Sequence, residues 1–269
     1  MKSASALIFS LVIAASTIVS TRAAAQAAPV SIPATSVASD PLFSAPAASL
    51  TPQQIESLQQ RLADWPELDH YRADNERLPA PVPGEQRVVF YGDSITDHWG
   101  RDNGSTFFPG KPYVNRGISG QTTAQMLVRF RQDVIDLHPA AVLILAGTND
   151  IAGNTGVSTL QMIEDNFRSM TELAKANHIR VILASVLPVS DYPWHRGLRP
   201  AGKICSFNAW LKQYATSSGV AYLDYYSALS NAQGGMDPKL ARDGVHPTPA
   251  GYAIMAPLAQ KAIDQTLAH

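Results

Sequence analysis

Five short apolar segments recur along the chain from residue 87 onward. They lie at residues 87–91, 113–115, 141–146, 181–186 and 220–223. Residues 141–146 (AVLILA) and 181–186 (VILASV) form continuous apolar runs, which are typical of strands covered on both faces of a sheet. The segment at 113–115 is the weakest of the five. The pattern predicts five strands.

Segments with helical periodicity separate these strands, at residues 121–136, 158–176, 203–217 and 248–267. The clearest has apolar residues on one side at helical spacing: Leu160, Ile163, Phe167, Met170 and Ala174. Strands that alternate with helices favour an α/β fold, a single doubly wound domain with a five-stranded parallel sheet. We see no internal repeat and no second domain, and we expect this domain to occupy residues 87–269.

The N-terminal residues carry a different pattern. A basic start, an apolar run over residues 6–19 and the small-residue site Ala25-Gln26-Ala27 predict a cleaved signal peptide over residues 1–27. An uncleaved anchor helix is the alternative, but the run is shorter than the ~20 residues of a spanning helix. We therefore expect a secreted or periplasmic protein without a stable membrane anchor after cleavage.

The segment between signal peptide and domain divides in two. Residues 28–49 are rich in Ala, Pro and Ser, which predicts a disordered linker. Residues 50–86 open with a helix, because Thr51 can cap it, Pro52 suits the first turn and Gln54 completes a capping box. We expect this helix to run to about residue 65, followed by an irregular connection.

Composition narrows the possible partners. The 269 residues carry a formal net charge of −1 and are 45% hydrophobic, which suits one large globular domain. A near-neutral chain gives no reason to expect nucleic acid or an anionic membrane as partner. Cys205 is the only cysteine, so an intramolecular disulfide is excluded. It lies in an apolar helical pattern, which predicts a buried, inert thiol.

Polar residues follow four of the predicted strands. Ligands of open α/β sheets bind outside the carboxyl ends of the strands. Gly92-Asp93-Ser94, residues 116–120 and Gly147-Thr148-Asn149-Asp150 come after the first three strands, and Asp243 to His246 lies beyond the fifth. Nucleophilic, polar and glycine-rich groups are thus predicted to meet at one edge of the sheet.

This edge could support nucleophilic catalysis. Ser94 is a poor nucleophile until a base takes its proton; His246 could do so, with Asp243 orienting the imidazole ring. The backbone N–H of Gly117 and the side chain of Asn149 could stabilise an oxyanion. Taken alone, each residue has a structural explanation: a helix cap for Ser94, a turn-stabilising pair for Asp243 and His246, and turn positions for Gly117 and Asn149.

Other residues near these strand ends are weaker candidates. Asp93 could pin its turn, and Asp150 could brace the loop that aims Asn149. Tyr192 and Trp194 lie in the loop after the fourth strand, which could line an acyl or alcohol pocket or simply pack on the surface. In the same loop, His195 is a rival general base, but it lacks an adjacent carboxylate at fixed spacing. His/Asp spacing typical of a metal site is absent, so we predict no metal and no other cofactor.

Four motifs together carry a resemblance: Gly92-Asp93-Ser94, Gly117, Gly147-Thr148-Asn149-Asp150 and Asp243-Gly244-Val245-His246. In order and separation they resemble the sequence blocks of the SGNH hydrolases, also called GDSL esterases and lipases. The resemblance spans residues 87–265 and departs at Ile95, where the family name has Leu. It implies a flavodoxin-like three-layer sandwich, a catalytic triad of Ser94, Asp243 and His246, and oxyanion donors at Ser94, Gly117 and Asn149. No G-x-S-x-G surrounds Ser94, which argues against the α/β-hydrolase elbow.

The expected function is a serine esterase for short-acyl (acetyl) esters of a small molecule or a carbohydrate. The family resemblance leaves lysophospholipase or thioesterase activity on longer acyl chains open. A catalytically silent glycan-binding protein on the same scaffold is a further alternative, although such a protein has no use for an oriented Ser-His-Asp set. A nucleotide-binding domain would need a glycine-rich phosphate loop, which the first strand end lacks. The sequence leaves the oligomeric state open.

Overall fold

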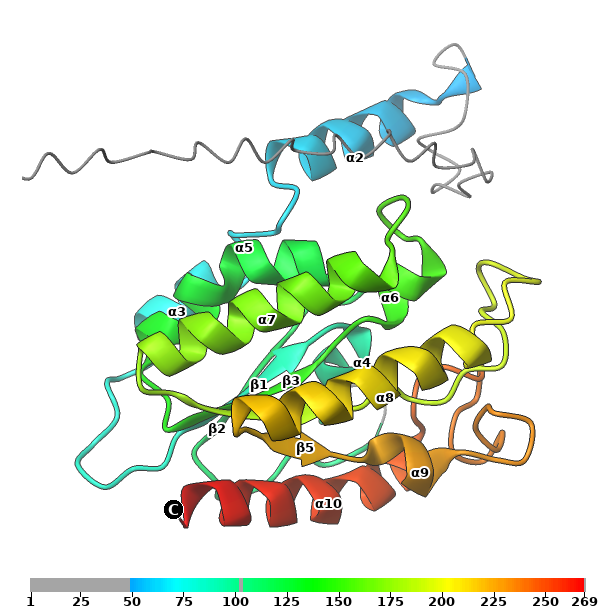
Figure 1. The fold of residues 1–269 in the computed structure, drawn as a ribbon. Coiled ribbons are helices and arrows are strands. Elements are labelled where there is room, and N and C mark those ends of the chain that lie inside the picture. The colour runs from blue at the N-terminus through cyan, green and yellow to red at the C-terminus, as the bar shows by residue number, and fades with distance from the viewer. Residues whose placement is uncertain (1–48, 102–103, 269) are drawn as a thin grey trace, which may run out of the picture. The chain divides into compact units, whose positions relative to one another are not determined.

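Five parallel strands form one sheet in the order β2-β1-β3-β4-β5 (Figure 1). The structure, a computed structural model, describes residues 49–101 and 104–268. The strands are β1 (Val88–Gly92), β2 (Tyr113–Gly117), β3 (Ala141–Leu145), β4 (Arg180–Ala184) and β5 (Ala221–Leu223). The order changes direction at β1, where the polypeptide crosses from β2 to β3. The predicted doubly wound α/β fold is confirmed.

Ten helical segments accompany the sheet in the described part of the chain. Six of them lie where the sequence predicts its five helices: α2 (Pro52–Ala63), α5 (Thr123–Asp133) with the 3-10 turn η2 (Ile135–Leu137), α7 (Leu160–Ala176), α8 (Ala201–Ser218) and α10 (Pro249–Leu267). The others are α3 (Arg72–Arg77), α4 (Ser94–Asp97), α6 (Thr148–Ala152) and α9 (Tyr225–Leu229). These are too short for apolar periodicity to reveal them. One of them, α3, lies in the connection that we expected to be irregular.

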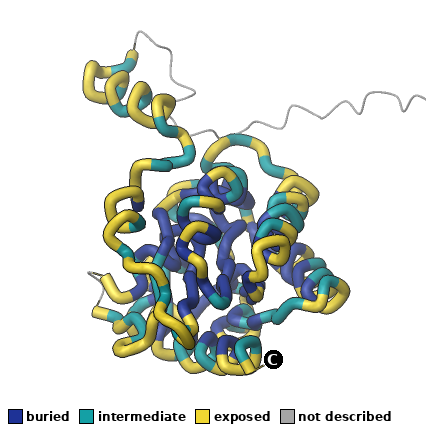
Figure 2. Tube along the Cα trace, turned by 90° about the vertical axis from the view of Figure 1, so that its left-hand side faces the viewer, coloured by how far each residue is buried: buried dark blue, intermediate teal, exposed yellow. Residues whose placement is uncertain are grey.

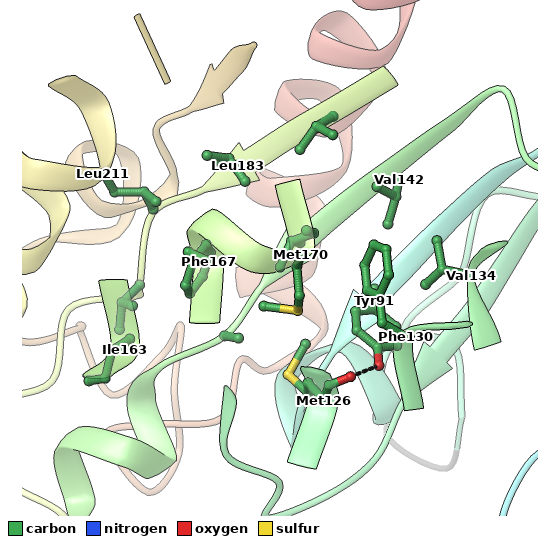
Figure 3. Packing of buried hydrophobic residues seen from close by; sticks show 14 of the residues in the cluster. Tyr91, Met126, Phe130, Val134, Val142, Ile163, Phe167, Met170, Leu183 and Leu211 are labelled. Carbon is green, nitrogen blue, oxygen red and sulfur yellow. Dashed lines mark hydrogen bonds between the residues drawn. The ribbon is translucent and has the colours of Figure 1, made fainter. Parts of the chain in front are cut away.

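Alternate residues of each strand face opposite layers of helices. In β1, Val89 and Tyr91 join the core beneath α5, α7 and α8, whereas Val88 and Phe90 join the core against α9 and α10. Figure 3 shows part of the first core, which includes Met126, Phe130 and Phe167 from the helices and Val142 and Leu183 from the strands. The central strands β1, β3 and β4 are therefore almost fully buried, whereas several residues of the edge strands β2 and β5 are half-buried. Figure 2 shows this buried interior in dark blue.

The start of helix α2 has the capping box that the sequence predicts. The Thr51 side chain accepts a hydrogen bond from the Gln54 N–H at 3.2 Å, and the Gln54 side chain accepts one from the Thr51 N–H at 2.8 Å. These two hydrogen bonds stabilise the first turn of the helix. Helix α2 buries none of its residues. The predicted signal peptide and nearly all of the predicted linker lie outside the described residues.

One expectation about the helices is wrong. Cys205 is exposed on α8, where its Sγ lies 3.2 Å from the Tyr226 hydroxyl, and is not the buried thiol that the apolar pattern predicts. Small, polar and apolar residues are spread around this helix, so the sequence does not mark clearly which side faces the solvent. Among residues 49–101 and 104–268, no helix combines the length and apolar character needed to cross a membrane.

Candidate active site

Ser94 stands at the carboxyl end of β1, as the first residue of the four-residue helix α4. Asp93 caps this helix, because its Oδ1 accepts a hydrogen bond from the Ile95 N–H at 2.9 Å. The turn requires glycine at position 92, since a Cβ there would lie 2.1 Å from Thr96 Oγ1 and 2.7 Å from the Leu145 carbonyl oxygen. Asp93 thus pins the turn that presents Ser94.

Asp243 and His246 form a local unit in the loop before α10. Asp243 Oδ1 accepts hydrogen bonds from the backbone N–H of Val245 at 3.0 Å and of His246 at 2.8 Å. Asp243 Oδ2 lies 2.6 Å from His246 Nδ1. Partial burial raises the pKa of Asp243, but these hydrogen bonds outweigh it and hold that pKa below its ordinary value. The carboxylate is therefore available to orient the imidazole.

The fold brings this unit to Ser94. His246 Nε2 lies 2.9 Å from Ser94 Oγ, although the two residues are 152 positions apart in the sequence. With Nδ1–H donated to Asp243, Nε2 is the nitrogen left to accept the serine proton. The structure thus places Ser94, His246 and Asp243 in a line suited to general-base activation of the hydroxyl.

Asn149 lies in the first turn of α6, after β3, and is 2% exposed. Its Nδ2 donates to the Gln121 carbonyl at 2.9 Å, and its Oδ1 accepts from Asn154 Nδ2 at 2.8 Å. An amide NH₂ carries two N–H groups, so one remains for a substrate oxygen. The structure thus places Asn149 just beyond the carboxyl end of β3, as predicted, and its role as an oxyanion donor stays a prediction.

The expectation for Gly117 is wrong. Its single N–H donates to Asn115 Oδ1 at 2.9 Å and is therefore not available to an oxyanion. Glycine is required at position 117 for packing, because a Cβ there would lie 2.1 Å from the backbone nitrogen of Asp97 in α4. Absence of a side chain lets β2 approach the helix that carries Ser94.

Gly120, in the loop that follows β2, is the better candidate and was missed. Within the described ranges its N–H has no hydrogen-bond partner, and the carbonyl of the next residue, Gln121, accepts from Asn149 Nδ2. Its φ of 81° lies in the left-handed region that favours glycine. The signal available in the sequence was the second glycine of the segment 116–120.

Two buried carboxyl groups lie behind these residues. Burial raises the pKa of Asp93 to about 7, and burial raises the pKa of Asp150 to about 6. Asp150 accepts hydrogen bonds from the Thr123 N–H at 2.9 Å and from the Thr123 hydroxyl at 2.6 Å. Asp150 thereby ties α6, which carries Asn149, to the start of α5.

The loop after β4 contributes one exposed aromatic side chain. Tyr192 is fully buried and its hydroxyl contacts Thr148 in α6, so it supports that helix and lines no pocket. Trp194 is 46% exposed, and its ring centroid lies 6.1 Å from that of His246. His195 Nδ1 lies 2.7 Å from the Ala152 carbonyl oxygen, to which it donates, whereas the imidazole that contacts Ser94 Oγ is that of His246.

A buried arginine that sequence reasoning did not identify connects the strand ends. Arg129 in α5 donates to the carbonyls of Gly92 and Arg116, both at 3.0 Å, and to Gln121 Oε1 at 2.5 Å. It also forms an ion pair with Asp133 at 3.0 Å. In the sequence, a single arginine in an amphipathic helix is typical of the solvent face, so no local signal marks it.

Across the described ranges, no group of three or more His, Cys, Asp or Glu side chains is arranged to hold a metal ion. The prediction that the protein uses no metal or other cofactor stays a prediction. A Ser-His-Asp arrangement of this kind can carry out acyl transfer without a metal ion.

Comparison with known proteins agrees with this geometry. The model of the GDSL-like lipase/acylhydrolase family matches residues 90–254. A GDSL-like lipase structure from Bacteroides thetaiotaomicron is 45% identical with a TM-score of 0.72, and the match covers 75% of this chain and 98% of that one.

Two curated relatives are also similar. An acetylxylan esterase of Geobacillus stearothermophilus is 27% identical over 205 residues, which are 64% of this chain and 90% of that protein. A lipoprotein of Bacillus subtilis is 36% identical over 82 residues, but the match spans only a third (33%) of that protein and 29% of this chain.

Proposed function

The chain belongs to the GDSL-like lipase/acylhydrolase family and is a carboxylic ester hydrolase, and from that premise we propose that it is an exported serine esterase acting on short-acyl esters of carbohydrates. The proposed nucleophile is Ser94, the proposed base is His246 and the proposed orienting carboxylate is Asp243. The observation that carries this proposal is the 2.9 Å contact between Ser94 Oγ and His246 Nε2.

The proposed mechanism is a two-step acyl transfer. Ser94 Oγ attacks the ester carbonyl carbon while His246 Nε2 takes the hydroxyl proton, and Asp243 stabilises the imidazolium. His246 then protonates the leaving alcohol as the C–O bond breaks, which leaves an acyl-serine. A water molecule, activated by the same imidazole, hydrolyses this ester and releases the acid.

Three donors are proposed for the oxyanion that forms in each step. They are the Ser94 N–H at the start of α4, the Gly120 N–H and one N–H of Asn149. What supports the last two is that each has an N–H with no hydrogen-bond partner among residues 49–101 and 104–268, and that the Gln121 carbonyl links their segments. Such donors stabilise the transition state more than the ground state, because the negative charge develops only during the reaction.

The carbohydrate part of the proposal has two supports. The similar acetylxylan esterase acts on an acetylated polysaccharide, as its name states. Trp194 is 46% exposed, its ring centroid lies 6.1 Å from that of His246, and its Nε1 donates to Asn154 Oδ1 at 3.0 Å. A partly exposed aromatic ring whose N–H is held in place suits packing against a sugar. Export rests on the sequence of residues 1–27 alone.

The test compares wild type with Ser94→Ala on p-nitrophenyl acetate. We expect Ser94→Ala to lose turnover while its thermal unfolding stays close to that of wild type, because the substitution removes only a hydroxyl. Ser206→Ala, which changes an exposed serine on α8, is the matched control and should keep full activity. Unchanged turnover of Ser94→Ala would exclude Ser94 as the nucleophile.

A second experiment defines the substrate. p-Nitrophenyl esters from acetate to palmitate should show the highest kcat/KM at the shortest acyl chains, and acetylated xylan should release acetate. A maximum at long chains would instead favour a lysophospholipase or thioesterase. Binding of the polysaccharide without acetate release, together with no labelling by a fluorophosphonate, would favour a silent glycan-binding protein.

A further inference from the structure

A chain of hydrogen bonds leads from the surface beside His246 to Asn149. Trp194 Nε1 donates to Asn154 Oδ1 at 3.0 Å, and Asn154 Nδ2 donates to Asn149 Oδ1 at 2.8 Å. Asn149 Nδ2 in turn donates to the Gln121 carbonyl at 2.9 Å. All three bonds therefore run in one direction, from the indole toward the loop that carries Gly120.

The two ends of this chain determine the orientation of the amides between them. An indole N–H can only donate, and a backbone carbonyl can only accept, whereas an asparagine side chain can present either its oxygen or its NH₂. With its oxygen turned to the indole, Asn154 must present NH₂ to Asn149. Asn149 then turns its own NH₂ away from Asn154, which leaves one N–H for an oxyanion. Bonds aligned in this way also polarise one another.

Asn154 contacts both segments that carry proposed oxyanion donors. Its backbone N–H donates to the Asn149 carbonyl at 3.0 Å, and its Nδ2 lies 3.5 Å from the Gly120 carbonyl oxygen. Asn154 itself follows α6 and is only half-buried. Its side chain therefore acts on Asn149 and Gly120 without lying in the core of the domain.

We infer that Asn154 and Trp194 are positioning residues for the oxyanion hole. They hold the NH₂ of Asn149 in the orientation that the transition state needs, and neither donates to the substrate oxygen itself. Because the Trp194 ring centroid lies 6.1 Å from that of His246, this relay connects the surface beside His246 to the proposed oxyanion donors. The inference rests on the proposed function, since it assigns a partner to Asn149 in that reaction.

Three variants test the direction of the relay by steady-state kinetics on p-nitrophenyl acetate. Trp194→Phe keeps an aromatic ring but removes the N–H, and should lower kcat about 3- to 10-fold with KM within about twofold. Asn154→Ala should lower kcat about 10-fold, a fraction of the 10²–10³ expected for losing an oxyanion donor. Asn154→Asp should be worse than Asn154→Ala, because its carboxylate attracts the Asn149 NH₂ and turns it away from the substrate.

Controls separate this role from general damage. Trp65→Phe alters a tryptophan of similar exposure, 42%, outside the relay and should retain wild-type kcat. The double variant Trp194→Phe/Asn154→Ala should be no slower than Asn154→Ala alone, since both changes break the same chain. Thermal unfolding of each variant, measured in parallel, checks that the compared proteins are folded.

The outcomes distinguish the relay from the proposed function. An active wild type whose kcat is unchanged in Trp194→Phe and Asn154→Ala would overturn the relay alone. The relay would also be overturned if Asn154→Asp had a higher kcat than Asn154→Ala, or if the variants changed KM alone. Losses of kcat that add up in the double variant would overturn it as well. If Ser94→Ala is as active as wild type, the proposed function fails and the relay fails with it.

Discussion

Arg129 provides the sharpest test of how the active-site edge is held together. Its side chain and that of Asp133 are both 0% exposed, and they form an ion pair at 3.0 Å. The substitution Arg129→Met keeps much of the aliphatic length but removes the guanidinium group. Asp133 then remains buried without its charged partner. The Asn75 side-chain NH₂, whose Nδ2 lies 2.7 Å from Asp133 Oδ1, still donates a hydrogen bond to it.

The expected loss is large because the partner charge stays behind. Removing one member of a buried ion pair typically costs about 3–5 kcal/mol, and domains are typically stable by only about 5–15 kcal/mol. The carbonyl of Gly92 is less affected, since it also accepts the Ile118 N–H at 3.1 Å. We therefore expect the free energy of unfolding of Arg129→Met to fall by about 3–5 kcal/mol.

Urea unfolding, followed by circular dichroism, measures this loss. The control is Arg129→Met/Asp133→Leu, which replaces the whole pair by apolar side chains and should recover most of the stability. The kcat of this double variant should nevertheless be lower than that of wild type. The Arg129 guanidinium, which donates to Gln121 and to the carbonyls of Gly92 and Arg116, is absent from it. A loss below about 1 kcal/mol in the single variant, or a double variant that is equally unstable, would refute the argument.

Three further predictions concern residues around Ser94. Because the pKa of Asp93 is about 7 in the folded protein against an ordinary 3.8, folding takes up a proton between these values. The free energy of unfolding should thus fall as pH rises from about 4 to about 7. Urea unfolding of Asp93→Asn over the same pH range should show a shallower fall. An equal fall in wild type and variant would contradict the raised pKa of Asp93. Gly120→Ala should be destabilised moderately by backbone strain at its φ of 81°. Gly117→Ala should unfold at a still lower temperature, since only at position 117 does a Cβ meet the backbone of Asp97; equal melting temperatures would count against this packing. Asn149→Ala should lose kcat by about 10²–10³ in ester hydrolysis, and an unchanged kcat with a higher KM would remove Asn149 from the oxyanion hole.

The fold was largely predictable because its signals are local. Buried parallel strands are continuous apolar runs, and long covering helices show periodicity over several turns. The short helices α4 and α6 escaped because each has only one turn. The same reasoning brought Ser94 and Asn149 to one edge, since polar residues after parallel strands share that edge whatever the loops do.

The details of the site depend on contacts that no local pattern encodes. Gly117 and Gly120 look alike in the sequence, but the N–H of Gly117 donates to the Asn115 side chain, whereas that of Gly120 has no partner in the part of the chain that the structure describes. Arg129 and Asn154 were missed for the same reason: their partners are distant in sequence, and their residue types are common on solvated surfaces. Such roles are assigned by hydrogen bonding, which only the folded chain specifies.

The loop from Asp243 to His246 has a consequence for how activity could be lost or tuned. Its carboxylate binds both the ring and the backbone of His246, so the two groups move together as one rigid unit. The proposed triad thus has a single long-range variable, the separation of His246 Nε2 from Ser94 Oγ. A shift of this loop on the order of 1 Å would interrupt proton transfer while leaving the dyad intact. Any ligand or substitution that displaces the loop would therefore change activity by changing this separation, while the hydrogen bonds between Asp243 and His246 stay as they are.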